Sequence, residues 1–236
     1  MTNRTIKILG VFAVLVAMMP IVEAKNKNKE TDILSFYYTH ATSEPIGTDE
    51  DGFICRWMML DPIKIDIRSN SALNSDYISN VISEEHFKGQ YELMPYDGQV
   101  VKVGKEKRMW HALDTRKFFV NLMRFAEGYG NEYYGQMYWV MTVVHCDEDI
   151  DNVRMSSGAN SAAVWWLNGE KTLMLCDDRD LIMDDCMSNR LTLKKGDNVI
   201  RGVVFNGPGM ADFCLRFVKE DGSPVKNISV IAKLKK

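Results

Sequence analysis

Four histidines limit the acid–base catalysis that this chain could perform. A serine hydrolase needs an imidazole that takes the proton of its nucleophilic serine, and the candidates here are His40, His86, His111 and His145. The Gly-x-Ser-x-Gly turn that exposes such a serine is absent, because Ser156-Ser157-Gly158 has no glycine at the required preceding position. A triad can also assemble from distant residues, so serine hydrolase chemistry stays open as an alternative.

Two of the histidines have neighbours that indicate their environment. His145 ends an apolar run that begins at Tyr138, so we expect a partly buried, hydrogen-bonded imidazole there. His111 follows Trp110, and we expect it at the surface.

Carboxylates are numerous but none is singled out. Glycoside hydrolysis needs two carboxyl groups held about 5–10 Å apart, and acidic runs occur at 84–85, 147–151 and 184–185. Asp177, Asp178 and Asp180 could supply calcium with oxygen ligands, although Arg179 interrupts them and the spacing is not that of an EF-hand. A solvated acidic loop is the default, so no cofactor is expected and calcium is the weaker alternative.

Aromatic side chains offer a different kind of chemistry, which is stacking on a sugar ring. Successive side chains of a strand point to opposite faces, so Trp165 and Trp166 must diverge. The alternatives are that one ring faces outward to stack on a sugar or that both are covered by neighbouring strands and loops. The candidate binding residues are Trp110, His111, Asn160, Trp166, Asn206 and Asp212.

The elements that must position these residues are short strands. Residues 162–167 and 172–175 flank Asn168-Gly169, whose tolerance of positive φ is typical of a tight hairpin turn. The remaining predicted elements are strands at 53–60, 63–67, 100–103, 109–113, 118–125, 138–146, 152–156, 190–193, 198–205 and 213–217, and one short helix at 75–87. The pattern predicts an all-β, antiparallel β-sandwich of jelly-roll type, with the strand at 138–146 in a central position.

The chain begins with features of an exported protein. Arg4 and Lys7 precede an apolar run and a small-residue cleavage pattern, which predicts a signal peptide over 1–24, then a flexible lead-in over 25–32 and one domain over 33–236. We therefore expect secretion or a periplasmic location, with no membrane span after cleavage. The net charge of −3 gives no basic footprint for nucleic acid.

Export permits disulfides, and the chain has five cysteines. Cys146 and Cys214 lie in strand-like runs and are expected to be buried apolar residues. Cys176 and Cys186 flank one loop and could close it, which the sequence cannot establish.

Three segments together resemble a known secreted module. Residues 164–169, 191–199 and 213–217, with an upstream match at 56–63, are similar to the galactose-binding-like jelly-roll accessory module, in particular the amino-terminal module of bacterial acetylxylan-esterase-type proteins. Related modules often carry paired aspartates before the hairpin, where this chain has Asn160-Ser161. That departure weakens any inherited metal site. Because the sequence runs only to Lys236, we expect no esterase domain after the sandwich.

The resemblance implies a non-catalytic module associated with polysaccharide degradation. Its expected partners are a plant cell-wall polysaccharide such as xylan, or a polysaccharide-degrading enzyme. An acetylxylan esterase and a structural protein–protein interaction module are the alternatives.

Overall fold

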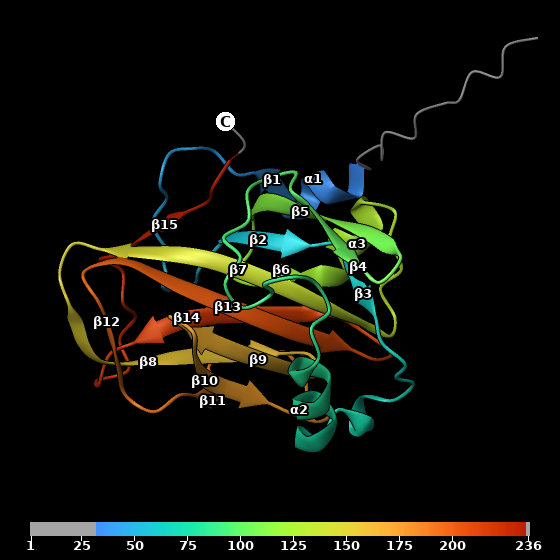
Figure 1. Ribbon diagram of the computed structural model, residues 1–236. Coiled ribbons are helices and arrows are strands. Elements are labelled where there is room, and N and C mark those ends of the chain that lie inside the picture. Colours follow the sequence, from blue (N-terminus) through green and yellow to red (C-terminus); the bar gives the residue numbers. More distant parts are fainter. Residues whose placement is uncertain (1–31, 235–236) are drawn as a thin grey trace, which may run out of the picture.

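The computed structural model describes residues 32–234, and their fold is an antiparallel β-sandwich (Figure 1). All strand pairings within this range are antiparallel. The predicted all-β class is therefore confirmed. The predicted signal peptide and almost all of the lead-in lie outside the described residues. No helix between residues 32 and 234 is long and apolar enough to cross a membrane.

The larger sheet has the strand order β1-β5-β2-β7-β13-β9-β10, and β3, β4 and β15 pair with its members. β7 and β13 form its long centre, with eleven paired positions running from Gly196 opposite Cys146 to Asn206 opposite Gln136. The bounds are β1 Tyr38–His40, β2 Arg56–Leu60, β3 Ile63–Lys64, β4 Val100–Val103, β5 Glu106–Thr115, β7 Gln136–Cys146, β9 Ala162–Leu167, β10 Glu170–Leu175, β13 Gly196–Asn206 and β15 Ser229–Ile231.

The smaller sheet has the order β11-β8-β14-β6, with β12 also paired to β8. Its bounds are β6 Val120–Asn121, β8 Ile150–Ala159, β11 Cys186–Met187, β12 Leu191–Leu193 and β14 Asp212–Val218. The α-helices of the described residues are α1 Asp32–Tyr37, α2 Ser75–Ser83 and α3 Leu122–Gly128, and residues 70–72 form a 3₁₀ turn.

One hydrophobic core lies between the two sheets. Trp57, Trp165 and Phe213 meet there, with ring centroids 5.0 to 5.8 Å apart. All three side chains are buried, and they come from β2, β9 and β14, so they join the larger sheet to the smaller one.

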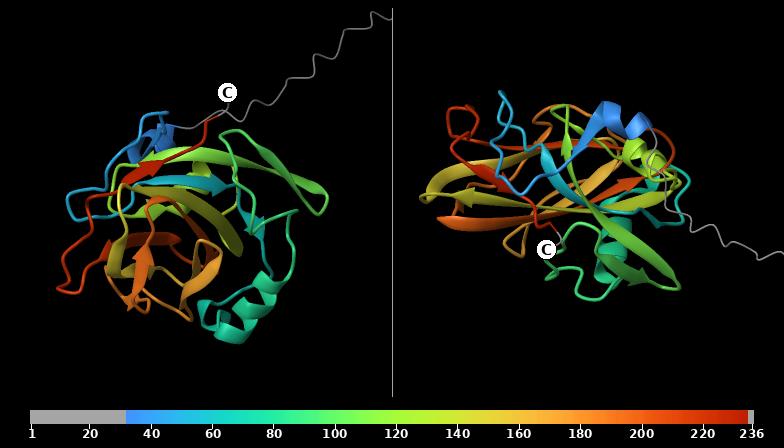
Figure 2. Two further views of the ribbon diagram at one scale, coloured as in Figure 1. Left: turned by 60° about the vertical axis from the view of Figure 1, so that its left-hand side comes forward. Right: turned by 90° about the horizontal axis from the view of Figure 1, so that it is seen from above.

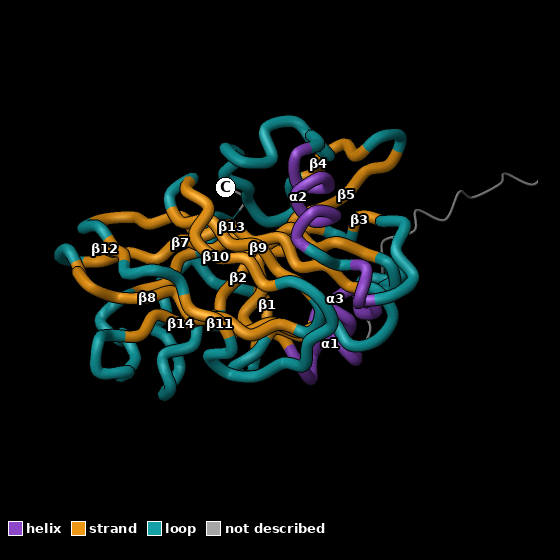
Figure 3. The backbone as a smooth tube through the Cα atoms, turned by 90° about the horizontal axis from the view of Figure 1, so that it is seen from below, coloured by secondary structure: helices purple, strands orange, loops and turns teal. Residues whose placement is uncertain are grey.

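A second core covers the opposite face of the larger sheet. Trp139 and Trp166 project from β7 and β9 into this cluster, where Phe87 and Ile78 pack from α2 and the segment after it. Figures 2 and 3 show α2 and that segment placed against the sheet. The larger sheet is therefore buried on both faces, and β7 contributes side chains to both cores.

The hairpin expected at Asn168-Gly169 is confirmed. These residues have φ angles of 51° and 88°, and they join β9 to β10. The opposite orientation of Trp165 and Trp166 is also confirmed, because each belongs to a different core.

The predicted strand over 118–125 is wrong, because only Val120–Asn121 is extended before α3 begins. The Asn121 side chain accepts a hydrogen bond from Arg124 N at 2.8 Å and so caps the helix. Leu122, Phe125 and Ala126 then bury one face of α3. The predicted helix at 75–87 ends earlier, at Ser83, and Asn74 caps it.

Candidate functional site

The tryptophans among the candidate binding residues are not available to a ligand. Trp166 is 7% exposed and lies between Trp139, which is stacked at 6.2 Å, and Tyr91 at 5.5 Å. Trp110 is buried against Phe87. Of the two alternatives for Trp165 and Trp166, the one in which both rings are covered is confirmed, and the outward-facing Trp166 is wrong. Segment 84–99 covers this face of the sheet, Trp110 included.

His111 is buried, which corrects the expectation of a surface imidazole. Its Nε2 lies 3.0 Å from Asp61 Oδ1, and its ring stacks on Tyr129 at 3.8 Å. His145 is partly buried and its Nδ1 lies 2.7 Å from Asp197 Oδ1, as predicted. Within the described range no serine hydroxyl is bonded to either imidazole, so these two His–Asp pairs complete no triad.

Three other candidate residues, Asn160, Asn206 and Asp212, come together at one end of the sandwich. We call these three residues and Ser161, which lies among them, the rim cluster. Asn160 N donates to Asp212 O at 2.9 Å. With the Asn160 amide oriented to satisfy both of its ends, its nitrogen donates to Asp212 Oδ2 and its oxygen accepts from Leu181 N, each at 3.2 Å. Asn206 follows the Phe205–Ala162 pair, which places it beside Ser161.

The rim cluster is buried, and its electrostatics follow from that burial. Loss of water raises the pKa of the Asp212 carboxyl to about 6, although Arg124 acts in the opposite direction. Ser161 Oγ, Asn206 Oδ1 and Asp212 Oδ1 have no hydrogen-bond partner within the described part of the chain. Each buried polar atom without a hydrogen-bond partner lowers the stability of the fold by about 1–3 kcal/mol.

The loop over residues 177–185, which we call the roof loop, covers the rim cluster. Ser161 N donates to Arg179 O at 3.1 Å. Asp184 anchors the loop to the smaller sheet, since its Oδ1 accepts from Arg216 Nε at 2.9 Å and from Ser156 Oγ at 2.6 Å. The loop backbone also passes so close to Gly158 that a Cβ there would lie 1.9 Å from Ile182 O.

The same loop carries the aspartates considered for calcium. Asp178 Oδ1 accepts from Asn70 Nδ2 at 2.9 Å, and Asp185 pairs with Arg179 Nε at 2.8 Å. Between residues 32 and 234 no three His, Cys, Asp or Glu side chains gather as a metal-ligand set. The five cysteines are free, with Cys146 and Cys214 buried as predicted.

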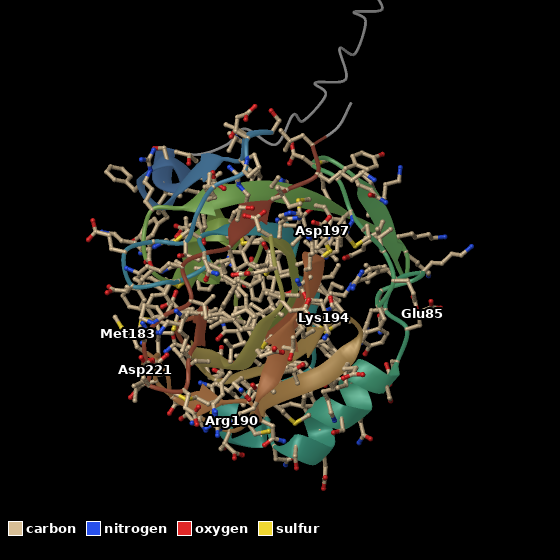
Figure 4. The ribbon with its side chains drawn as sticks, turned by 90° about the vertical axis from the view of Figure 1, so that its left-hand side faces the viewer. Glu85, Met183, Arg190, Lys194, Asp197 and Asp221 are labelled. Atoms are coloured by element: carbon tan, nitrogen blue, oxygen red, sulfur yellow. The ribbon has the colours of Figure 1, made fainter. Side chains whose placement is uncertain are left out.

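An open depression lies at the other end of β9, where the Asn168-Gly169 turn approaches residues 188–194. We call it the polar groove. Its volume is about 480 Å³, which suits a small saccharide. Arg190 and Lys194 mark its position at the end of the molecule that faces the viewer in Figure 4. Its lining residues are Leu167, Asn168, Glu170, Lys171, Thr172, Ser188, Asn189, Arg190, Leu191, Thr192 and Lys194.

Some polar side chains of this groove serve the fold and others are free. The Asn168 amide donates to Asn198 Oδ1 at 3.0 Å and accepts from Val199 N at 2.8 Å, so it holds the hairpin turn. Glu170, Lys171 and Asn189 are exposed and make no side-chain hydrogen bond or ion pair with any residue in the range 32–234. A carboxylate, an ammonium and an amide therefore remain free to bind a ligand.

None of the six candidate binding residues lines this groove. The available sequence signal was the concentration of polar residues on both sides of the Asn168-Gly169 turn and across Ser188-Asn189-Arg190. This signal does not identify a site, because the two segments are separated in the sequence and only the folded sandwich brings them together.

Comparison with known proteins identifies no family for this chain. No family model matches the chain, and no curated protein matches it, so the resemblance to acetylxylan-esterase-type modules gains no support. Two solved structures align at 10% identity. The PA14 domain of the MpAFP antifreeze protein has a TM-score of 0.41, with 84% of this chain and 97% of that chain covered. The PA14 sugar-binding domain from an RTX adhesin has a TM-score of 0.39, with 76% and 99% covered.

Proposed function

We propose that this protein is a secreted, non-catalytic glycan-binding β-sandwich module and that the polar groove is its binding site. The observation that supports this most is the set of free side chains in the groove, which are Glu170, Lys171 and Asn189. Sugar hydroxyls both donate and accept hydrogen bonds, and this set offers charged and neutral partners for both roles.

The groove also favours a polar ligand over an apolar one. Exposed polar side chains supply most of its lining, and they include the cations Lys171, Arg190 and Lys194. Arg190 pairs with Glu220 at 2.7 Å and Lys194 with Asp149 at 3.2 Å, so Lys171 is the unpaired cation among these three. Recognition here rests on hydrogen bonds and charge, and it replaces the aromatic stacking expected from the sequence.

Xylan is the first polysaccharide to test, because the sequence motifs resemble accessory modules of xylan-degrading enzymes. Purified protein should bind at least one plant cell-wall glycan on an array, and affinity electrophoresis in gels containing that glycan then measures the dissociation constant. The variants Lys171→Ala and Asn189→Ala should each weaken binding by roughly three- to tenfold, the loss of one hydrogen bond.

The control is Asn227→Ala, which changes an exposed asparagine outside the groove. Circular dichroism spectra and urea midpoints should match the wild type for all three variants. Binding that is unchanged in both groove variants, or an array with no retained glycan, would reject the proposal.

A further inference from the structure

The hairpin formed by β4 and the first part of β5 extends beyond the rest of the larger sheet (Figure 2). β5 pairs with β2 and β1 only from Trp110 onward, so residues 106–108 pair with β4 alone, while the Met109 main chain also hydrogen-bonds to Asp61. Within the described range β4 has no second neighbour. Its outer edge therefore leaves main-chain N–H and C=O groups free to pair with another strand.

The register of this hairpin gathers apolar and cationic side chains on one face. Val100 lies opposite Met109, and these two residues are 48% and 37% exposed. The next pair on the same face is Lys102 opposite Lys107. Neither lysine forms an ion pair with any residue between 32 and 234, and like charges directly opposite each other destabilise a hairpin. On the other face, Arg108 pairs with Glu106.

A groove runs along the free side of β4. Its volume is about 660 Å³, and residues 88–94 form its second wall. Figure 3 shows the segment after α2 running beside the hairpin. Leu93, Met94 and Val100 make the lining apolar. Its charged residues are the cations Lys88 and Lys102 and one carboxylate, Glu92, so the lining keeps a positive excess. We call this depression the edge groove.

A buried cation lies directly beneath one wall of the edge groove. Arg201, on β13, is 7% exposed, and its Nη2 donates to Leu93 O at 2.9 Å and approaches Met94 Sδ at 3.4 Å. It forms no salt bridge with a described carboxylate, and loss of water lowers its pKa, although the nearby charge of Glu92 acts in the opposite direction. The region therefore has two independent sources of positive charge, the hairpin lysines and this guanidinium. Both favour an anionic occupant.

We propose that the edge groove is a docking site for an extended, acidic segment of a partner protein, which adds to β4 as a strand. Main-chain hydrogen bonds form along the free edge of β4, and alternate side chains of the segment point to opposite faces. Apolar side chains contact Leu93, Met94 and Val100, and carboxylates neutralise Lys102 and Lys107. The ligand and the surface differ from those of the polar groove.

A fluorescein-labelled peptide, Glu-Val-Glu-Val-Glu-Val-Glu, tests this proposal by fluorescence anisotropy at low salt. It should bind in a saturable and salt-sensitive manner, whereas Lys-Val-Lys-Val-Lys-Val-Lys should not. An acidic peptide that is N-methylated at alternate residues keeps its charge but cannot pair with β4, and it should not bind. The double variant Lys102→Gln/Lys107→Gln should weaken binding roughly tenfold, the loss of two exposed ion pairs.

The matched control is Lys219→Gln/Lys226→Gln, which makes the same change of charge on the exposed loop after β14 and should leave the affinity unchanged. Equal binding of the basic or N-methylated peptide would overturn the proposal, as would equal losses in both double variants. If the free protein sediments as a dimer and Val100→Asp dissociates that dimer, the edge groove binds a second copy of this chain and not an acidic partner. Failure to bind glycans would not affect any of these outcomes.

Discussion

Asp212 provides the most direct test of how the rim cluster is built. Burial raises the pKa of its carboxyl from 3.8 to about 6 in the folded protein. The folded state therefore binds the proton more tightly than the unfolded state between these two pH values. Stability must fall as the pH rises through this window, because ionisation leaves a charge in a site that water does not reach.

The magnitude follows from the same numbers. A difference of about two units corresponds to about 3 kcal/mol, at roughly 1.4 kcal/mol per unit. This loss of folding stability is small below about pH 3.8 and almost complete above about pH 6. The substitution Asp212→Asn keeps the shape and an oxygen acceptor for the Asn160 amide, and it removes the titration.

We therefore expect the variant to gain stability over the wild type as pH rises. Urea denaturation at half-unit steps from pH 4 to 7.5 gives the free energy of unfolding of both proteins. Their difference removes contributions from all other titrating groups. It should grow by about 2.5 kcal/mol in favour of Asp212→Asn, because roughly 0.5 kcal/mol of the effect is already present at pH 4. A difference that stays flat, or that shrinks with rising pH, would show that Asp212 is hydrated or paired and would refute the account of the rim cluster.

Two further predictions concern the packing around the two ends of β9. Gly158→Ala should displace the roof loop, because the new Cβ would meet Ile182 O. We expect urea denaturation to show about 1–3 kcal/mol of destabilisation. The free energy of unfolding should also depend less on pH, because Asp212 becomes more hydrated. An unchanged urea midpoint would mean that the roof loop already leaves room for a Cβ at position 158. Trp166→Ala should cost about 3–5 kcal/mol, because the ring is enclosed by Trp139 and Tyr91, while glycan affinity per folded molecule should not change. If the fully folded variant lost affinity for the glycan, Trp166 would again be a candidate binding residue.

The sequence predicted the sandwich because its strands carry local signals. The Asn168-Gly169 turn and the long apolar run of β7 both specify structure within a few residues, and both appear where expected. The error at 118–125 arose because α3 is short and begins at a capping asparagine, Asn121, inside an apolar run that also fits a strand. Periodicity cannot separate the two over such a length.

Site residues were harder to predict because burial depends on distant segments. Trp166 points to the opposite face of the sheet from Trp165, as predicted. That face is covered by residues 84–99, and no local sequence pattern reveals this. His111 is buried by Tyr129 and Asp61, which lie far from it in the sequence. The pairing of Asn160 with Asp212 likewise depends on β8 and β14 being neighbours.

The two proposed binding surfaces should act independently. The polar groove and the edge groove share no lining residue, and Trp166 lies between them, paired with Lys171 of the polar groove and in ring contact with Tyr91. Coupling requires an element with two arrangements that both ligands bias. β9 has none, because it is paired with β13 on one side and β10 on the other. The acidic peptide should therefore bind with the same affinity, within about twofold, at saturating glycan. A larger shift that Tyr91→Leu abolishes would show that the two grooves communicate through this aromatic contact.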